Sequence, residues 1–234
     1  NQLIGSLKIC DPAVGSGHFL VSALNEIIAI KSELKILLVR DGKTLRDYVV
    51  EVVNDELVIT DDDGRFFRYN PLNEESQRVQ EALFHEKQTI IENSLFGVDI
   101  NPKSVMICRL RLWIELLKNA YYKRDEVPGD GVPRKLETLP NLDINIKCGN
   151  SLISRFPLDA DLGLALRKSK WDIGSYRLAV MTYRNAQTKE QKHAMEKLIG
   201  DIKRDFETEV ARNAKRLLRL NKLKGALTTL PMQT

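Results

Sequence analysis

The chain has 234 residues and a formal net charge of +4, with 43% hydrophobic and 29% charged residues. These proportions are typical of a globular protein, and they exclude a disordered tail, a collagen-like repeat and a disulfide-rich mini-protein. The longest apolar stretch, residues 25–39, contains four charged residues and is too short to span a bilayer. Because no signal peptide opens the sequence, we expect a cytoplasmic protein without membrane contact. The chain begins at Asn1 without an initiator Met, so we expect it to be a segment of a longer protein.

Cysteine and histidine residues are dispersed along the sequence, and no two of them have the short spacing of metal ligands. We therefore predict no metal site, and free thiols in a reducing compartment. The residues are Cys10, Cys108, Cys148, His18, His85 and His193.

The apolar residues follow the period of a strand in some segments and the period of a helix in others. Short apolar runs bounded by turn residues predict the strands of a buried sheet, and amphipathic segments between them predict helices. In chain order we expect a strand at 7–12, a helix at 19–39, a small antiparallel meander within 41–70, a helix at 73–92, a strand at 94–100, a helix at 102–122, a loop at 125–141, a strand at 142–150, one or two helices within 159–185 and a long helix at 188–224.

This alternation predicts an α/β fold with a doubly wound parallel sheet and helices on both of its faces. Residues 41–72 depart from the pattern, and we interpret them as a small β-meander insertion. At the end of the chain, apolar residues recur at steps of three and four and predict one long helix. We expect this helix to form a helical hairpin with the helices before it. The predicted domains are therefore a sheet domain at 1–156 and a helical insertion at 157–234.

The most specific motif is DPAVGSGHFL at residues 11–20. A strand brings Asp11 to its carboxyl end, and Gly15 and Gly17 permit a tight turn and a close approach of a ligand to the backbone. The helix that follows offers its N-terminus, which favours negative charge. The motif is not the dinucleotide fingerprint, because Leu20 occupies the third glycine position, and it is not a Walker loop, because no Gly-Lys-Ser/Thr follows.

These ten residues resemble motif I of the class I S-adenosylmethionine (SAM) dependent N6-adenine DNA methyltransferases. That family includes the single-chain type II and IIG restriction–modification enzymes, which carry an NPPY catalytic motif. The segment FGVDINPKSVMICRLRLWIELL at 96–117 is similar to the family's second-strand motif, and CGNSLI at 148–153 is similar to its third-strand motif. The similar segments cover residues 7–25, 94–122 and 139–156. The resemblance implies a Rossmann-like class I methyltransferase sheet, here incomplete, with SAM at the carboxyl ends of the strands.

In the family's second-strand motif an acidic residue accepts hydrogen bonds from both ribose hydroxyls of SAM. The resemblance assigns this role to Asp99, with Ile100 against the adenine ring. A carboxylate suits a cis-diol because it offers an acceptor to each hydroxyl. Asp99 lies 88 residues after Asp11, or 36 when residues 41–92 are left out as an insertion. The alternative is that Asp99 is the N-cap of the helix that begins at Pro102.

The third-strand motif of the family usually supplies an acidic acceptor for the SAM adenine amino group. This sequence has Asn150 there, a neutral acceptor, so we expect a weaker contact. The alternative is that Asn150 ends the strand with an Asx turn. The full set of cofactor-binding residues that the resemblance implies is Asp11, Pro12, Ala13, Gly15, Gly17, Phe19, Asp99, Ile100, Asn150, Ser151 and Leu152.

The resemblance implies that the parent protein transfers a methyl group from SAM to adenine N6 in a specific double-stranded DNA sequence, after flipping the base. The NPPY motif does not occur in the chain, so we predict no catalytic residue here and a fragment that is inactive alone. Two alternatives stay open. One is a non-catalytic module with the SAM fold that binds DNA or a partner, and the other is an NPPY-type methyltransferase that acts on RNA or protein.

Positive charge is concentrated near the end of the chain, where residues 187–234 contain 11 Lys and Arg against 6 Asp and Glu. Several of these cations could hold DNA through its phosphates. The ordinary interpretation of such a run is a solvated helix face. The candidate DNA-contacting residues are Arg212, Lys215, Arg216, Arg219 and Lys222.

Overall fold

The computed structural model describes residues 1–39, 41–123, 135–142, 144–153, 160–186 and 188–228, and for residue 217 and residues 220–228 it describes the backbone alone. The chain forms two compact units, Asn1–Ser151 and Leu152–Thr234. None of the helices in these ranges is long and apolar enough to cross a bilayer. The first unit contains α1 (Gln2–Ser6), β1 (Ile9–Asp11), α2 (His18–Glu33), β2 (Tyr48–Val53), β3 (Glu56–Asp61), α3 (Glu74–Asn93), β4 (Leu95–Asp99), α4 (Pro102–Leu117) and β5 (Ile146–Cys148). The second contains α5 (Leu162–Lys168), α6 (Ile173–Arg184) and α7 (Lys189–Thr228).

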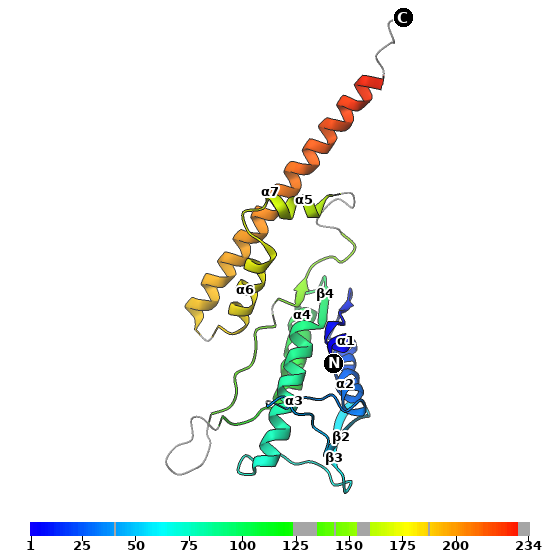
Figure 1. The fold of residues 1–234 in the computed structure, drawn as a ribbon, viewed down its shortest axis with the longest axis vertical. Coiled ribbons are helices and arrows are strands. Elements are labelled where there is room, and N and C mark those ends of the chain that lie inside the picture. Colours follow the sequence, from blue (N-terminus) through cyan, green and yellow to red (C-terminus); the bar gives the residue numbers. More distant parts are fainter. Residues whose placement is uncertain (40, 124–134, 143, 154–159, 187, 229–234) are drawn as a thin grey trace, which may run out of the picture. The chain divides into compact units, whose positions relative to one another are not determined.

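A parallel three-stranded sheet lies at the centre of the first unit, with β4 between β1 and β5 (Figure 1). Leu95 and Ile146 point to the same face of the sheet and are fully buried. They belong to one hydrophobic core with Leu20 and Leu24 of α2 and Leu112 of α4. This parallel sheet with its helices confirms the predicted α/β class.

Helix α2 is shorter than its apolar pattern predicts. We expected it to continue to Val39, but it ends six residues earlier, because Lys35 has a left-handed backbone with φ of 54°. The Lys35 amide donates to the carbonyl of Ser32 at 2.9 Å. The Ile36 amide donates to the carbonyl of Lys31 at 2.9 Å, which completes a Schellman C-cap. Glycine usually takes this position, so the lysine gave no stop signal in the sequence.

The third strand of the sheet is also shorter than the predicted 142–150. Directly before Ile146 the chain forms a turn at residues 144–145, and the Asn145 side chain binds the backbone of a neighbouring segment. The side-chain amide of Asn145 lies 2.8 Å from the carbonyl oxygens of Ile91 and Glu92 and 3.0 Å from that of Leu95. Asn145 therefore joins the end of α3 to the start of β4, and pairing with β4 begins only at Ile146.

The predicted meander contains two strands, β2 and β3. β2 and β3 pair as an antiparallel hairpin, whose turn residues Asn54 and Asp55 both have left-handed backbones. The run at 65–69 joins β3 only through an isolated bridge between Thr60 and Phe66. The helix predicted at 102–122 ends at Leu117, and the short α1 was not predicted. The predicted loop at 125–141 lies largely outside the described residues.

In the second unit, α5 and α6 pack against α7 (Figure 1). The Tyr183 hydroxyl donates to Glu196 at 3.2 Å, near the turn between α6 and α7. Further along α7, Asp205 accepts from the Ser169 hydroxyl at 2.7 Å. As residue numbers increase along α7, the residues that it contacts in the preceding segment have decreasing numbers. Helices α6 and α7 are therefore antiparallel. Among the described side chains of this unit, the buried apolar residues are Ala165, Ala179, Tyr183, Ile202 and Val210.

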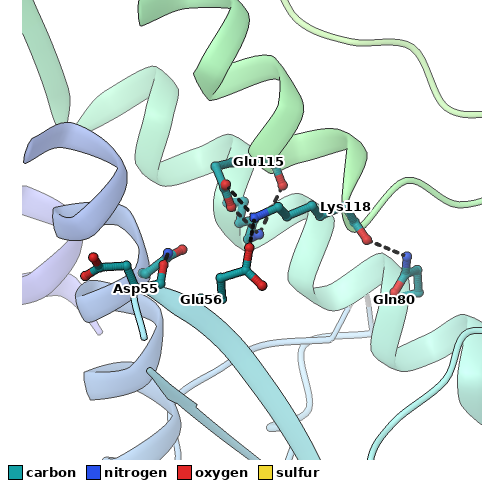
Figure 2. A network of polar contacts seen from close by, with 7 residues as sticks. Asp55, Glu56, Gln80, Glu115 and Lys118 are labelled. Atoms are coloured by element: carbon teal, nitrogen blue, oxygen red, sulfur yellow. Dashed lines mark hydrogen bonds and ion pairs between the residues drawn. The ribbon is translucent and has the colours of Figure 1, made fainter. Parts of the chain in front are cut away.

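Polar contacts hold the β2–β3 hairpin to α2 and α4 (Figure 2). Asn25 of α2 is fully buried and donates to the backbone carbonyl of Asp55 at 2.8 Å. Lys118 follows α4, and its Nζ lies 3.2 Å from Oε1 of Glu56 and 2.9 Å from Oε1 of Glu115. The hairpin turn is therefore fixed on two sides.

Lys87 of α3 meets the same network from inside the protein, where its side chain is 1% exposed. Its Nζ lies 3.0 Å from the backbone carbonyl oxygen of Glu115 and 3.4 Å from the carboxylate Oε2 of that residue. Burial lowers the pKa of Lys87 to about 8, although the Glu115 charge acts in the opposite direction. Burying Lys87 as a charged ammonium therefore costs more free energy than burying it as a neutral amine.

We predict that Lys87 makes stability rise with pH in the alkaline range. An unfolded lysine has a pKa of about 10.4, so between about pH 8 and pH 10 the unfolded chain binds more protons than the folded one. The free-energy cost of burying the charged Lys87 side chain is fully present below about pH 8 and is lost as the pH rises toward 10. This cost amounts to a few kcal/mol at most. Urea unfolding at pH 8, 9 and 10 should show that the free energy of unfolding of the wild type increases relative to that of Lys87→Met. The exposed Lys103→Met serves as control, and parallel pH curves for wild type and Lys87→Met would contradict the assignment.

Candidate functional site

The loop at residues 12–17 folds over the carboxyl ends of β1 and β4. Asp11 ends β1, and its Oδ1 accepts a hydrogen bond from the Ala13 amide at 3.0 Å, which turns the chain. The Val14 amide then donates to the carbonyl of Val98 in β4 at 2.9 Å. The sequence motif thus forms a loop that is anchored on the neighbouring strand before α2 begins.

Asp99, at the end of β4, binds this loop directly. Its Oδ2 accepts from the Gly15 amide at 2.9 Å, and its Oδ1 accepts from the Asn101 amide at 2.8 Å. The N-cap of α4 is Asn101, whose side chain accepts from the Lys103 amide at 2.9 Å. Asp99 is therefore not the N-cap of that helix, and the alternative considered from the sequence is wrong. A carboxylate has about four acceptor positions, so two hydrogen bonds leave Asp99 able to accept more.

The two glycines of the loop have left-handed backbones, with φ of +52° at Gly15 and +83° at Gly17. A Cβ at Gly15 would have only the Ala13 carbonyl oxygen near it, at 3.9 Å, so that side of the loop is open. A Cβ at Gly17 would lie 2.7 Å from Sγ of Cys108 in α4. The close approach that Gly17 permits is thus an approach of α4 to the start of α2, inside the protein.

Two large apolar side chains beside the loop and the strand end are exposed. Phe19, in the first turn of α2, is 56% exposed, and Ile100, directly after Asp99, is 74% exposed. Pro12 and Ala13 are also exposed. The edge of the sheet therefore offers a carboxylate, an open glycine backbone and apolar surface.

The third-strand residues come to the same edge through the backbone. The Gly149 amide donates to the carbonyl of Asp99 at 2.9 Å, which places the end of β5 next to the end of β4. Asn150 and Ser151, which follow, are exposed. Leu152 is the first residue of the second unit. The structure thus brings the predicted residues from Asp11 to Ser151 to one edge of the first unit.

Cys108 lies beneath this edge and is fully buried. Burial, assisted by the nearby Asp11 charge, raises the pKa of its thiol to about 11. The thiol therefore stays protonated at neutral pH and acts as a small packing group. Among the described residues, no group of three His, Cys, Asp or Glu side chains is arranged to hold a metal ion.

The basic residues predicted to contact DNA lie on α7. Arg212, Lys215, Arg216 and Arg219 are exposed, whereas Val210 on the same helix is buried. Arg212 forms an ion pair with Glu209 one turn earlier, so its charge is partly compensated. The side chain of Lys222 lies outside the described residues.

Sequence reasoning missed three residues that shape this edge, namely Val14, Gly97 and Cys108. Each acts through a contact with a residue more than 80 positions away: a Cβ at Gly97 would lie 2.8 Å from Cγ2 of Val14, and Cys108 faces Gly17. No periodicity or motif in the sequence reports such contacts. The only available signal was a glycine in the middle of a buried strand, which usually marks a close approach.

Comparison with known proteins assigns the chain to a family. Residues 1–210 match the family model described as MmeI, DNA-methyltransferase domain. A protein of Methanocaldococcus jannaschii, named as a type II restriction enzyme and methyltransferase, is 33% identical over 153 residues, which are 64% of this chain and 9% of that protein. The chain therefore corresponds to a small part of that relative's length. No solved structure matches the chain.

The parallel α/β sheet, the glycine loop at its carboxyl edge and the family match define a DNA-methyltransferase domain. The chain belongs to the MmeI DNA-methyltransferase domain family. The methyltransferase class that the motifs predicted is thereby confirmed.

We predict that the two loop glycines differ in their tolerance of a side chain. Gly17→Ala combines a left-handed backbone with a clash against Cys108, so the free energy of unfolding should fall by about 2 to 5 kcal/mol. Gly15→Ala has the backbone cost alone, about 1 to 2 kcal/mol. Urea unfolding monitored by circular dichroism measures both, and equal losses would show that the Cys108 contact does not restrict Gly17.

Proposed function

We propose that this chain is the SAM-binding part of a site-specific DNA adenine-N6 methyltransferase from a restriction–modification system. The observation that carries the proposal is the 2.9 Å hydrogen bond from the Gly15 amide to Asp99 Oδ2. It holds a glycine loop and a strand-end carboxylate together at one edge of a parallel sheet. Ligands of open α/β sheets bind at this edge, outside the carboxyl ends of the strands.

The residues at this edge fit SAM. Asp99 has acceptor positions left for the two ribose hydroxyls, and the exposed side chains of Phe19 and Ile100 offer apolar surface to the adenine ring. The open side of Gly15 lets a ligand reach the backbone. Asn150 offers a neutral acceptor to the adenine amino group. The remaining proposed cofactor contacts are Asp11, Pro12, Ala13, Gly17, Ser151 and Leu152.

SAM supplies an activated methyl group, and this chain's part is to bind the cofactor and fix its orientation. Adenine N6, in a base flipped out of double-stranded DNA, is the proposed acceptor. The groups that hold that base belong to an NPPY motif, which this sequence lacks. The chain therefore contributes the cofactor half of the reaction.

The proposal also assigns a role to each part of the chain. Residues 1–156 are the SAM-binding part, an incomplete doubly wound Rossmann-like sheet with a β-rich insertion at 41–72. Residues 157–234 are a helical insertion, and its basic helix α7 contacts the phosphates of the DNA. We place the parent protein in the cytoplasm, where its DNA substrate lies.

We predict that Asp99→Ala lowers SAM affinity at least about tenfold, because each charge-assisted hydrogen bond contributes roughly 1.5 to 3 kcal/mol. Calorimetric titration of the full natural protein with SAM measures the change. The exposed Asp62→Ala is the matched control and should bind like the wild type. Since Asp99 also accepts from two backbone amides, circular dichroism must show that the variant is folded. Unchanged affinity in folded Asp99→Ala would refute the cofactor site.

We also predict that α7 holds DNA through phosphates. Each neutralised phosphate contributes a slope of about −0.9 to a plot of log affinity against log salt. Changing Arg212, Arg216 and Arg219 together to Ala should therefore flatten this plot by about 2 to 3 units in the full natural protein. The matched control changes three exposed cations of the first unit, Lys43, Arg46 and Arg65. An unaltered slope with intact SAM binding would assign α7 to architecture and not to DNA.

A further inference from the structure

Gly97 in the middle of β4 is required by packing and not by its backbone. Its φ is not in the left-handed region, where only Gly15, Gly17, Gly42 and Gly64 are found among the described glycines. A Cβ built on Gly97 would lie 2.8 Å from Cγ2 and 3.0 Å from Cβ of Val14, and 3.3 Å from Cδ1 of Ile146. Real Cβ atoms essentially never approach other atoms this closely, so any side chain at Gly97 must displace Val14.

Val14 occupies the space that Gly97 leaves, and it is 4% exposed. Its backbone belongs to the loop that the site depends on, since its amide donates to the carbonyl of Val98 at 2.9 Å. The next amide, that of Gly15, donates to Asp99 at 2.9 Å. The Val14 side chain and the Gly15 amide are thus adjacent parts of one anchored turn, and a shift of the first moves the second.

We propose that Gly97 and Val14 form a size-matched pair that positions the Gly15 amide on Asp99 and so prepares the edge of the sheet for SAM. Both are positioning residues, because neither is assigned a contact with the cofactor. The inference rests on the proposed function for the identity of the ligand. It does not rest on that function for the coupling between Gly97 and Gly15.

The test compares three variants of the full natural protein. Gly97→Ala adds the clashing Cβ, and Gly97→Ala with Val14→Ala removes the Cγ2 methyl group that this Cβ would meet at 2.8 Å. Gly5→Ala is the matched control, because a Cβ there has no atom within 4 Å. Hydrogen exchange of the peptide at 12–19, followed by mass spectrometry without ligand, reports the Gly15 amide. Calorimetric titration reports SAM affinity.

We expect Gly97→Ala to accelerate exchange of the Gly15 amide and to lower SAM affinity about tenfold, the effect of a strained core contact transmitted to the site. The double variant should recover most of both losses, and Gly5→Ala should match the wild type. If Gly97→Ala fails to fold, Val14→Ala alone decides the question, because it adds no clash and should still accelerate Gly15 exchange and weaken SAM binding.

Wild-type exchange of Gly15 in folded Gly97→Ala would overturn the proposal, and so would faster exchange with unchanged SAM affinity. A loss that Val14→Ala does not relieve would also overturn it, because the pair would then not be size-matched. Failure of the proposed function has a different signature. In that case the wild type and Asp99→Ala give the same SAM titration, while the exchange data still report whether Gly97 and Gly15 are coupled.

Discussion

The hydrogen bond between the Gly15 amide and Asp99 joins the loop after β1 to the end of β4, across 84 residues of sequence. It can form only because β1 and β4 are parallel neighbours in a fixed register, in which Asp11 pairs with Gly97. That register places the loop after β1 directly over the last residues of β4. The segment between β1 and β4 must therefore bring the chain back so that β4 starts in the correct register with β1. The cost of closing such a long loop grows only slowly with its length, so a large insertion is compatible with this site.

Buried ion pairs, together with the apolar core, fix how α3 docks between its neighbours. Lys31 of α2 pairs with Glu86 of α3, and the next residue, Lys87, meets Glu115 of α4. Adjacent positions on α3 thus reach two different helices with charges of opposite sign. Burying such pairs adds little net stability, because desolvation opposes the attraction between the charges. Their value is that a displaced helix would leave a buried charge without its partner, and we infer that this sets the position of α3 between α2 and α4.

The sequence predicted what local chemistry encodes and missed what distant contacts decide. The loop after Asp11 was predictable because the glycines at positions 15 and 17 indicate a left-handed backbone. The end of α2 was not predictable, because Lys35 takes the left-handed position without a glycine. The short third strand was also missed, since the apolar pattern at 142–150 does not reveal that Asn145 turns inward to bind three carbonyl groups. The candidate site was predicted as a set of residues, but the hydrogen bond that unites Gly15 with Asp99 needed the fold.

The two glycines of the GSG sequence also show that one motif can combine separate requirements. Both have positive φ, yet only Gly15 faces open space, whereas Gly17 faces Cys108. Gly15 therefore leaves the backbone accessible, and Gly17 lets α4 approach the start of α2. The same division holds one strand away, where Gly97 accommodates Val14. Because α4 and β4 each touch the loop through a contact that tolerates no added atom, the loop has little freedom to adjust. A larger side chain at Cys108 or Gly97 would thus alter the site from inside the core, without any contact with the ligand.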